Sequence, residues 1–300
     1  MKLSSQKIKK RIKFLTNFQK ITKSVSLISA VRFQKRIIVI KRIIPNIFYL
    51  LNIFYRIANK YSEEVKKLSE KRNVQQDNNL IIVVSSDRGL AGSFDQLIFK
   101  KTEDLISEQS NYLLGVIGQK GVNYFKRKYN LEFSFYNFEN FLPENLAREL
   151  FDYINYLLTA KEINNIYFVR SNLSSSGFIV EDLKIFPYDI KTIESLIDKI
   201  VPKMREWEKF KIEYYYNQVF ADYIFEPNIR IALLTILKNL FYLILYVLIL
   251  ESQASLELTR TITMRKANEN AKRIKDKTIL EYNKLRQQKI TEELIDLLRL

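Results

Sequence analysis

The stretch that decides the fold is residues 228–300, NIRIALLTILKNLFYLILYVLILESQASLELTRTITMRKANENAKRIKDKTILEYNKLRQQKITEELIDLLRL, 73 residues without a proline or a glycine. Because these two residue types are the usual helix breakers, their absence predicts one continuous α-helix. At about 1.5 Å per residue the helix would reach roughly 110 Å. No compact domain of this size buries such a helix along its length, so it needs a second long helix or a partner protein.

The other end of the chain supplies a matching helix, because residues 5–44 also lack proline and glycine. One narrow stripe recurs there in alternating steps of four and three, the spacing of a coiled-coil seam. Its members are Ile8, Ile12, Leu15, Gln19, Thr22, Ser26, Ser29 and Phe33. Pro45 is expected to kink or interrupt the helix, and a helical pattern resumes over residues 47–68. We expect the two terminal helices to pair in antiparallel orientation.

Between the terminal helices, the sequence alternates strand-like and helix-like segments. Residues 80–86, LIIVVSS, form a short apolar run typical of a strand buried on both faces. Further strands are expected at 112–117 and 131–138, an antiparallel pair at 166–170 and 178–186, and helices from 96 to about 110, at 120–128 and at 144–159. This alternation predicts an α/β domain. The predicted organisation is an N-terminal coiled-coil helix at 1–75, an α/β domain at 76–226 and a C-terminal coiled-coil helix at 227–300.

Composition excludes several classes of active site. Among 300 residues there is no histidine and no cysteine. Thiolate zinc sites, cysteine nucleophiles, disulfide frameworks, histidine-dependent triads and two-histidine metal sites are therefore excluded. The sequence also shows neither paired carboxylates in an acid/base arrangement nor a metal-ligand cluster. We accordingly predict no catalytic residue, no cofactor and no metal site in this chain.

The positive charge is concentrated at the N-terminus. The chain has 49 Lys+Arg against 33 Asp+Glu, a formal net charge of +16. Residues 1–62 contain 15 of the basic residues and no acid, which leaves 34 basic and 33 acidic residues in the remainder. A field of this kind indicates an acidic partner: nucleic acid, anionic lipid or an acidic protein surface. A nucleic-acid-binding protein is the alternative function from a different class.

Residues 231–250, IALLTILKNLFYLILYVLIL, are long enough for a transmembrane helix. Lys238 lies near the centre, however, and a central lysine costs about 2.5–3.5 kcal/mol on insertion scales. We therefore favour a helix segment buried in protein, with the membrane span as the alternative.

The loop after the first strand, residues 87–95 (DRGLAGSFD), precedes a helix and so has the position of a phosphate-binding loop. Its glycines do not have the spacing of either common nucleotide-binding motif. Asp87, Arg88, Gly89 and Gly92 are therefore interpreted as a tight structural turn.

Three blocks of sequence resemble one family, the γ subunit of F-type ATP synthase, the central rotor shaft. They are residues 19–23 (QKITK) with Ser29, Ala30 and Arg32 after them, residues 86–92 (SDRGLAG), and residues 282–295 (YNKLRQQKITEELI). The resemblance implies N- and C-terminal helices in an antiparallel coiled coil around an inserted Rossmann-like α/β domain. It also implies that this chain is a non-catalytic subunit, because ATP chemistry belongs to the surrounding ring.

The resemblance further implies partners and contact residues. The implied partners are three α and three β subunits, an ε subunit and a membrane ring of c subunits, on the cytoplasmic face of a bacterial plasma membrane, with no nucleic acid and no membrane span in this chain. Residues in the matched blocks are expected to meet the β-subunit catch loops: Gln19, Lys20, Thr22, Lys23, Arg286 and Gln287. The alternative within this class is the shaft of a specialised motor that is not coupled to proton transport.

Overall fold

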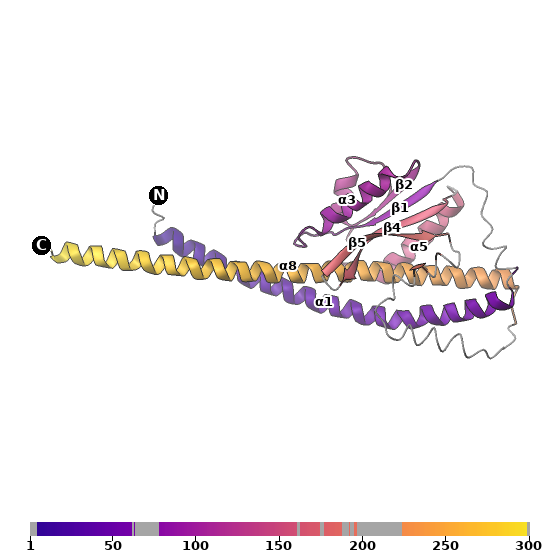
Figure 1. The fold of residues 1–300 in the computed structure, drawn as a ribbon, viewed down its shortest axis with the longest axis horizontal. Coiled ribbons are helices and arrows are strands. Elements are labelled where there is room, and N and C mark those ends of the chain that lie inside the picture. Colours follow the sequence, from indigo (N-terminus) through magenta and orange to yellow (C-terminus); the bar gives the residue numbers. More distant parts are fainter. Residues whose placement is uncertain are drawn as a thin grey trace. The chain divides into compact units, whose positions relative to one another are not determined.

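The computed structural model describes residues 5–61, 63, 78–160, 163–174, 177–187, 192, 195–196 and 224–298. Its longest elements are the two terminal helices, α1 (Ser5–Lys60) and α8 (Ile229–Leu298), and between them in sequence lies the α/β domain (Figure 1). The predicted unbroken C-terminal helix is confirmed, since α8 is 70 residues long.

The expected interruption of the helix at Pro45 is wrong, because α1 continues through this residue. A proline removes the hydrogen bond to the carbonyl four residues earlier, which here belongs to Lys41. Both Lys41 and Pro45 are exposed, so water can hydrogen-bond to that carbonyl. Buried side chains on the opposite face hold the helix on both sides of the proline: Ile43, Ile44, Ile47 and Phe48.

The chain divides into two compact units. One, which we call the seam unit, comprises residues 1–33, 90–92 and 257–300, and the other, the sheet unit, comprises 34–89 and 93–256. Both terminal helices contribute to both units. The three-part division at 1–75, 76–226 and 227–300 follows the order of the elements and stays a prediction, since residues 75 and 76 lie outside the described part of the chain.

In the seam unit the two helices are antiparallel. As the residue number increases along α1, the number of the contacting residue in α8 decreases. Lys9 lies over the Tyr282 ring, the Gln19 carbonyl accepts from Asn268, and the Ser26 hydroxyl donates to the Thr261 carbonyl. The expected stripe lies in this seam: Ile8, Leu15, Thr22, Ser26 and Ser29 are buried, and Ile12, Gln19 and Phe33 are half-buried.

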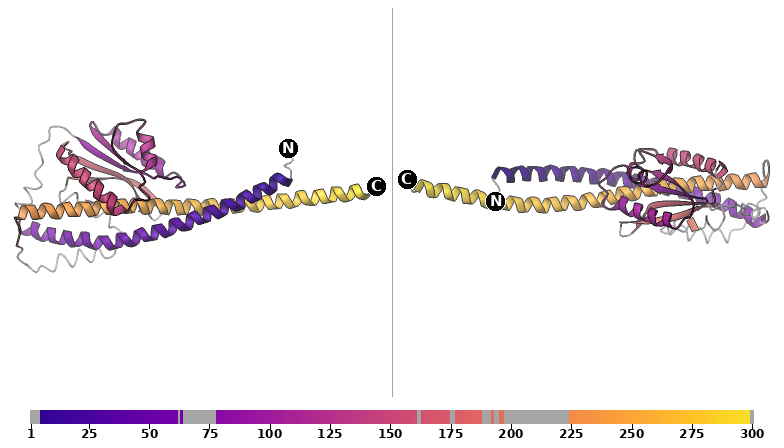
Figure 2. Two further views of the ribbon diagram at one scale, coloured as in Figure 1. Left: turned by 180° about the vertical axis from the view of Figure 1, so that it is seen from behind. Right: turned by 90° about the horizontal axis from the view of Figure 1, so that it is seen from above.

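The sheet unit contains a five-stranded sheet in the order β3-β2-β1-β4-β5. Its strands are β1 (Asn79–Val84), β2 (Tyr112–Ile117), β3 (Leu131–Phe135), β4 (Asn165–Ser174) and β5 (Gly177–Phe186). The neighbours β1–β2, β1–β4 and β2–β3 are parallel, while β4–β5 is the predicted antiparallel pair. This is the order of a doubly wound sheet half, with an antiparallel edge strand added. Among its described residues, the helices of this domain are α3 (Phe94–Ser107), α4 (Gln119–Phe125) and α5 (Pro143–Ala160) (Figure 2).

Strand β3 ends at Phe135, earlier than the predicted 138. The chain turns at Asn137, which takes a positive φ of 58°. Left-handed backbone cannot continue a strand, and asparagine tolerates it better than most residues. Phe138 beyond the turn is buried, at 1% exposure.

The apolar segments of α1 and α8 form the core of the sheet unit together with the sheet and α5. Side chains of α8 from Leu233 to Leu250 and of α1 from Ile40 to Ile57 belong to one cluster with β1 and α5. Both α1 and α8 contain windows that are long and apolar enough to cross a membrane, and 56% of the α8 window is buried in the protein. Lys238 is on the exposed face of α8. This packing supports the protein-buried interpretation of residues 231–250.

Candidate functional site

The predicted contact residues of the N-terminal block, residues 19–23, lie partly in the seam between the two helices and partly on the exposed surface. Thr22 is only 2% exposed, and its hydroxyl accepts from Asn268 Nδ2 at 3.0 Å. Asn268 Nδ2 also donates to the Gln19 carbonyl at 2.7 Å, and Lys275 Nζ donates to Gln19 Oε1 at 2.7 Å. Lys20 and Lys23 are exposed. Gln19 and Thr22 therefore join the two helices, whereas the two lysines remain accessible to a partner.

The C-terminal block lies elsewhere on the seam unit. Arg286 and Gln287 are both exposed on α8, and the Gln287 carbonyl accepts from the Thr291 hydroxyl at 3.0 Å. Arg286 follows Lys275, a contact of Gln19, by 286 − 275 = 11 positions, which is about 17 Å along a helix. The structure therefore does not bring the two predicted blocks together, and they lie at different positions along the seam unit.

A largely exposed apolar row on α1 was not predicted from the sequence as a contact surface for a partner protein. Its members follow heptad spacing beside the seam, and all except the half-buried Val25 are exposed: Phe14, Phe18, Ile21, Val25 and Ile28. Phe14 is 65% and Ile21 60% exposed, and the Phe14 and Phe18 rings stack at 6.2 Å. The sequence does contain a pattern that could have identified this row, since Ile21, Val25 and Ile28 follow the same spacing as the seam. Contiguous exposed apolar surface of this kind marks an interaction site.

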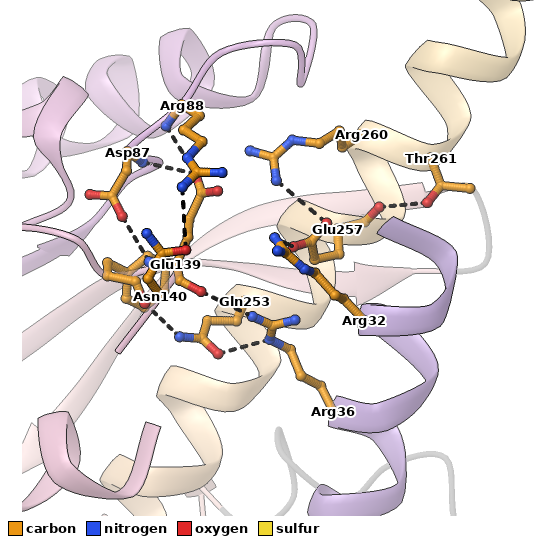
Figure 3. A network of polar contacts seen from close by, with 11 residues as sticks. Arg32, Arg36, Asp87, Arg88, Glu139, Asn140, Gln253, Glu257, Arg260 and Thr261 are labelled. Carbon is orange, nitrogen blue, oxygen red and sulfur yellow. Dashed lines mark hydrogen bonds and ion pairs between the residues drawn. The ribbon is translucent and has the colours of Figure 1, made fainter. Parts of the chain in front are cut away.

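The loop after β1 is held by two carboxylates that cap each other's backbone. Asp87 accepts from the Gln119 amide at Oδ1 (2.9 Å) and from the Glu139 amide at Oδ2 (2.7 Å). In return, Glu139 Oε1 accepts from the amides of Asp87 (3.0 Å) and Arg88 (2.9 Å) (Figure 3). This reciprocal arrangement fixes the turn against the segment that follows β3. Glu139, 52 residues further along, has no sequence pattern that links it to this loop.

Carboxylates occupy the start of this loop, where a phosphate would otherwise bind. Three amides there already donate to carboxylates, because the Ser86 amide donates to Asp95 Oδ1 at 2.9 Å and the next two amides donate to Glu139. These carboxylates would also repel a phosphate. Gly92 has a positive φ of 61°, and Gly89 lies where an added Cβ would be 3.2 Å from Lys120 Nζ. The geometry is that of a structural turn.

Two further side chains connect this region to the terminal helices within the sheet unit. Gln253 of α8 donates from Nε2 to the Phe138 carbonyl at 2.7 Å. Its Oε1 accepts from Arg36 Nε of α1 at 2.8 Å, and Arg36 Nη2 reaches the Glu139 carbonyl at 3.5 Å (Figure 3). Neither residue was singled out in the sequence, where both look like ordinary polar positions of a helix.

Each unit also contains a buried ion-pair cluster. In the sheet unit, Arg170 of β4 is fully buried and pairs through Nη1 with Glu251 of α8 and through Nη2 with Glu181 of β5, the latter at 2.9 Å. In the seam unit, Glu257 pairs with Arg32 at 3.6 Å and Arg260 at 3.4 Å. Each cluster ties α8 to another element of its own unit.

The clearly shifted pKa values lie away from these contacts. A hydrogen bond to Glu103 raises the pKa of Lys128, and burial raises the pKa of Tyr246. Within the described residues no group of three acidic side chains is arranged to hold a metal ion. The arrangement is suited to holding elements in register and to offering surface to partners.

A family model described as ATP synthase matches residues 4–299. The "ATP synthase gamma chain" of Caldanaerobacter subterraneus subsp. tengcongensis is 27% identical over 298 residues, 96% of each chain. That of Buchnera aphidicola subsp. Schlechtendalia chinensis is 29% identical over 308 residues, 98% of this chain and 96% of the relative.

Two solved structures share the fold. The rotor of Euglena gracilis mitochondrial ATP synthase has a TM-score of 0.58 at 10% identity and covers 95% of this chain and 98% of its own. The central stalk and c-ring structure of Tetrahymena thermophila mitochondrial ATP synthase gives 0.56 at 16% identity, with 82% and 99% covered.

Proposed function

The chain belongs to the ATP synthase family, and we infer that it is the gamma chain, the central-stalk subunit of an F-type enzyme. Its partners are the α and β subunits of the ring and the membrane c ring, and it is a peripheral component of a membrane-associated complex. The observation that carries this function is the antiparallel pairing of a 56-residue and a 70-residue helix around a Rossmann-like insertion.

The seam unit has the properties of a shaft. Its seam is closed by side-chain bonds such as Lys275–Gln19 and Asn268–Gln19, so the helices resist sliding past each other. Most of the apolar row of α1 and residues 286–295 of α8 remain exposed. Because the exposed faces differ around the helix pair, rotation would present a different surface to each ring subunit in turn. Coupling then arises from differential contact with the open and closed states of those subunits.

We propose that the polar and the apolar exposed residues of this chain contact different parts of the ring of α and β subunits. The exposed lysines Lys20 and Lys23 and the exposed pair Arg286 and Gln287 meet acidic catch loops of the β subunits. The apolar row from Phe14 to Ile28 makes apolar contacts with the inside of the ring. Gln19 and Thr22, which the resemblance had included among the ring contacts, act instead by holding the seam.

We propose that rotation couples ATP synthesis or hydrolysis in the ring to ion movement through the c ring, on the cytoplasmic face of a bacterial plasma membrane with an ε subunit bound. The family membership and the gamma-chain relatives support this placement. The shaft of a motor that drives a process other than proton transport remains the alternative within the same class.

Reconstitution tests the function. This chain is combined with the α and β subunits of its own organism, and the complex is isolated and assayed for ATP hydrolysis and rotation. We expect a stable complex in which Lys20→Glu with Lys23→Glu lowers the rate of ATP-driven rotation. The matched control, Lys126→Glu with Arg127→Glu, changes exposed basic residues near the end of α4 and should leave the rate unchanged. Recovery of the chain as a stable monomer beside an empty ring would refute the proposal.

A further inference from the structure

A buried polar belt follows the apolar part of α8. Its side chains are nearly inaccessible to water although all are polar: Glu251, Ser252, Gln253 and Ser255. Directly before it, residues 247–250 are all apolar and buried. Burying polar groups is unfavourable unless each finds a partner, so such a belt inside an apolar interface calls for a specific role.

The belt reaches the α/β domain at two separate places. Glu251 pairs with Arg170 in the sheet, while Gln253 donates to the Phe138 carbonyl in the segment after β3. Glu251 and Gln253, which are two positions apart on α8, therefore bind one strand and one loop of the α/β domain. Two directional contacts at different points fix both the position and the angle of one body against another.

A continuous series of polar contacts extends from this belt. Arg36 of α1 donates to Gln253 Oε1 at 2.8 Å and to the Glu139 carbonyl at 3.5 Å. The Glu139 carboxylate in turn accepts from the amides of Asp87 and Arg88. Both terminal helices are thus connected to the segment after β3, and that segment to the loop after β1 (Figure 3).

Apolar contact alone would not fix this geometry. The hydrophobic effect is non-directional and depends on buried area, so an apolar interface tolerates small rotations. Buried polar contacts penalise any shift that breaks them, because the freed groups lose both protein and water partners. Specification of register is a documented use of such groups.

We propose that Arg36, Gln253 and Glu139 form a torque joint, which fixes the angle of the α/β domain on the helix pair so that the two turn together without slip. The inference rests on the proposed function, since a joint of this kind matters only in a rotating shaft. The three act as positioning residues through the Phe138 and Glu139 carbonyls and the loop after β1. They touch no reacting group.

The chain has no cysteine, so one introduced cysteine is the only attachment point for a bead on this chain, and the α and β subunits are used in cysteine-free form. In the rotating complex with α and β subunits, beads are attached in separate preparations through Arg127→Cys, on the α/β domain, or Arg56→Cys, on α1; both positions are exposed. The angular spread of each bead is measured while the motor pauses. In the wild type we expect the two spreads to agree.

Arg36→Met combined with Gln253→Leu removes the joint and retains apolar volume. Losing one net hydrogen bond raises the population of misaligned states about fivefold. The fraction of pauses with a misaligned bead attached through Arg127→Cys should therefore rise at least about fivefold, which widens the angular spread. The spread measured through Arg56→Cys and the ATPase rate should remain at wild-type values. Arg36→Lys, which retains a donor, should restore part of the lost alignment. Gln34→Leu, an exposed glutamine of α1, is the matched control.

Equal angular spreads of the beads at the two attachment points in the double variant would overturn the proposal of a torque joint. If that variant does not fold, Gln253→Met, which is nearly isosteric, is measured in the same way with the same two outcomes. The underlying function fails separately, when the wild-type chain neither assembles with the ring nor rotates. A complex that rotates normally with both variants therefore rejects only the joint.

Discussion

Replacing Glu251 by glutamine should destabilise the sheet unit strongly. Arg170 is fully buried and has two carboxylate partners, Glu251 of α8 and Glu181 of β5. Glu251→Gln preserves the shape of the side chain but removes one of the two negative charges. The guanidinium is then left in the core with Glu181, whose side chain is 20% exposed and therefore offers a weaker, partly hydrated partner.

Removing one member of a buried ion pair costs about 3–5 kcal/mol. Natural domains have free energies of unfolding of about 5–15 kcal/mol, so the loss is a large fraction of the total. For a unit of this size each kcal/mol lowers the melting temperature by about 2–4 °C, which gives an expected decrease of roughly 6–20 °C. Urea and thermal unfolding of the full chain, followed by circular dichroism, measure both quantities.

Two controls separate burial from charge. Glu144→Gln removes one member of an exposed pair with Arg148, whose side chains are 58% and 68% exposed, and should cost less than about 0.5 kcal/mol. Arg170→Met with Glu251→Leu and Glu181→Leu removes all three charges of the cluster and should recover most of the stability. A loss below about 1 kcal/mol for Glu251→Gln, or a triple variant as unstable as Glu251→Gln, would contradict this account.

Three other variants test separate features. Gly118→Ala should prevent folding of the α/β domain, because its Cβ would lie 2.3 Å from the backbone oxygen of Ser85 at a φ of +101°, and near-wild-type unfolding curves would contradict this. Asn268→Leu removes the donor to Gln19 and should lower the stability of the helix pair by about 1–3 kcal/mol, seen as faster amide exchange in residues 5–33. Burial raises the pKa of Tyr246, so the unfolded state loses its proton first and stability falls as the pH rises through the ordinary tyrosine pKa near 10. Tyr246→Phe should flatten this alkaline loss, and an unchanged slope of unfolding free energy against pH would rule the contribution out.

The elements were largely predictable because local patterns specify them. An unbroken run without proline or glycine predicted α8, and short apolar runs predicted β1 and β2 at nearly their observed bounds. The seam of α1 followed from a repeat of four and three residues. The expected interruption of the helix at Pro45 was wrong for a reason that local sequence does not show. The free-energy cost of a proline in a helix depends on whether the carbonyl that loses its hydrogen bond is accessible to water.

The sequence by itself determined the two long helices, the α/β insertion and the absence of histidine and cysteine chemistry, because each depends on residue type or short-range periodicity. The partners of these elements came from the tertiary structure: Asn268 of α8 donates to Thr22 and to the Gln19 carbonyl, and Gln253 binds the Phe138 carbonyl and Arg36. The two partners of Gln253 are 115 and 217 residues away from it in the chain. A hydrogen bond of that kind depends on where two distant segments meet, and packing of the whole core fixes that place.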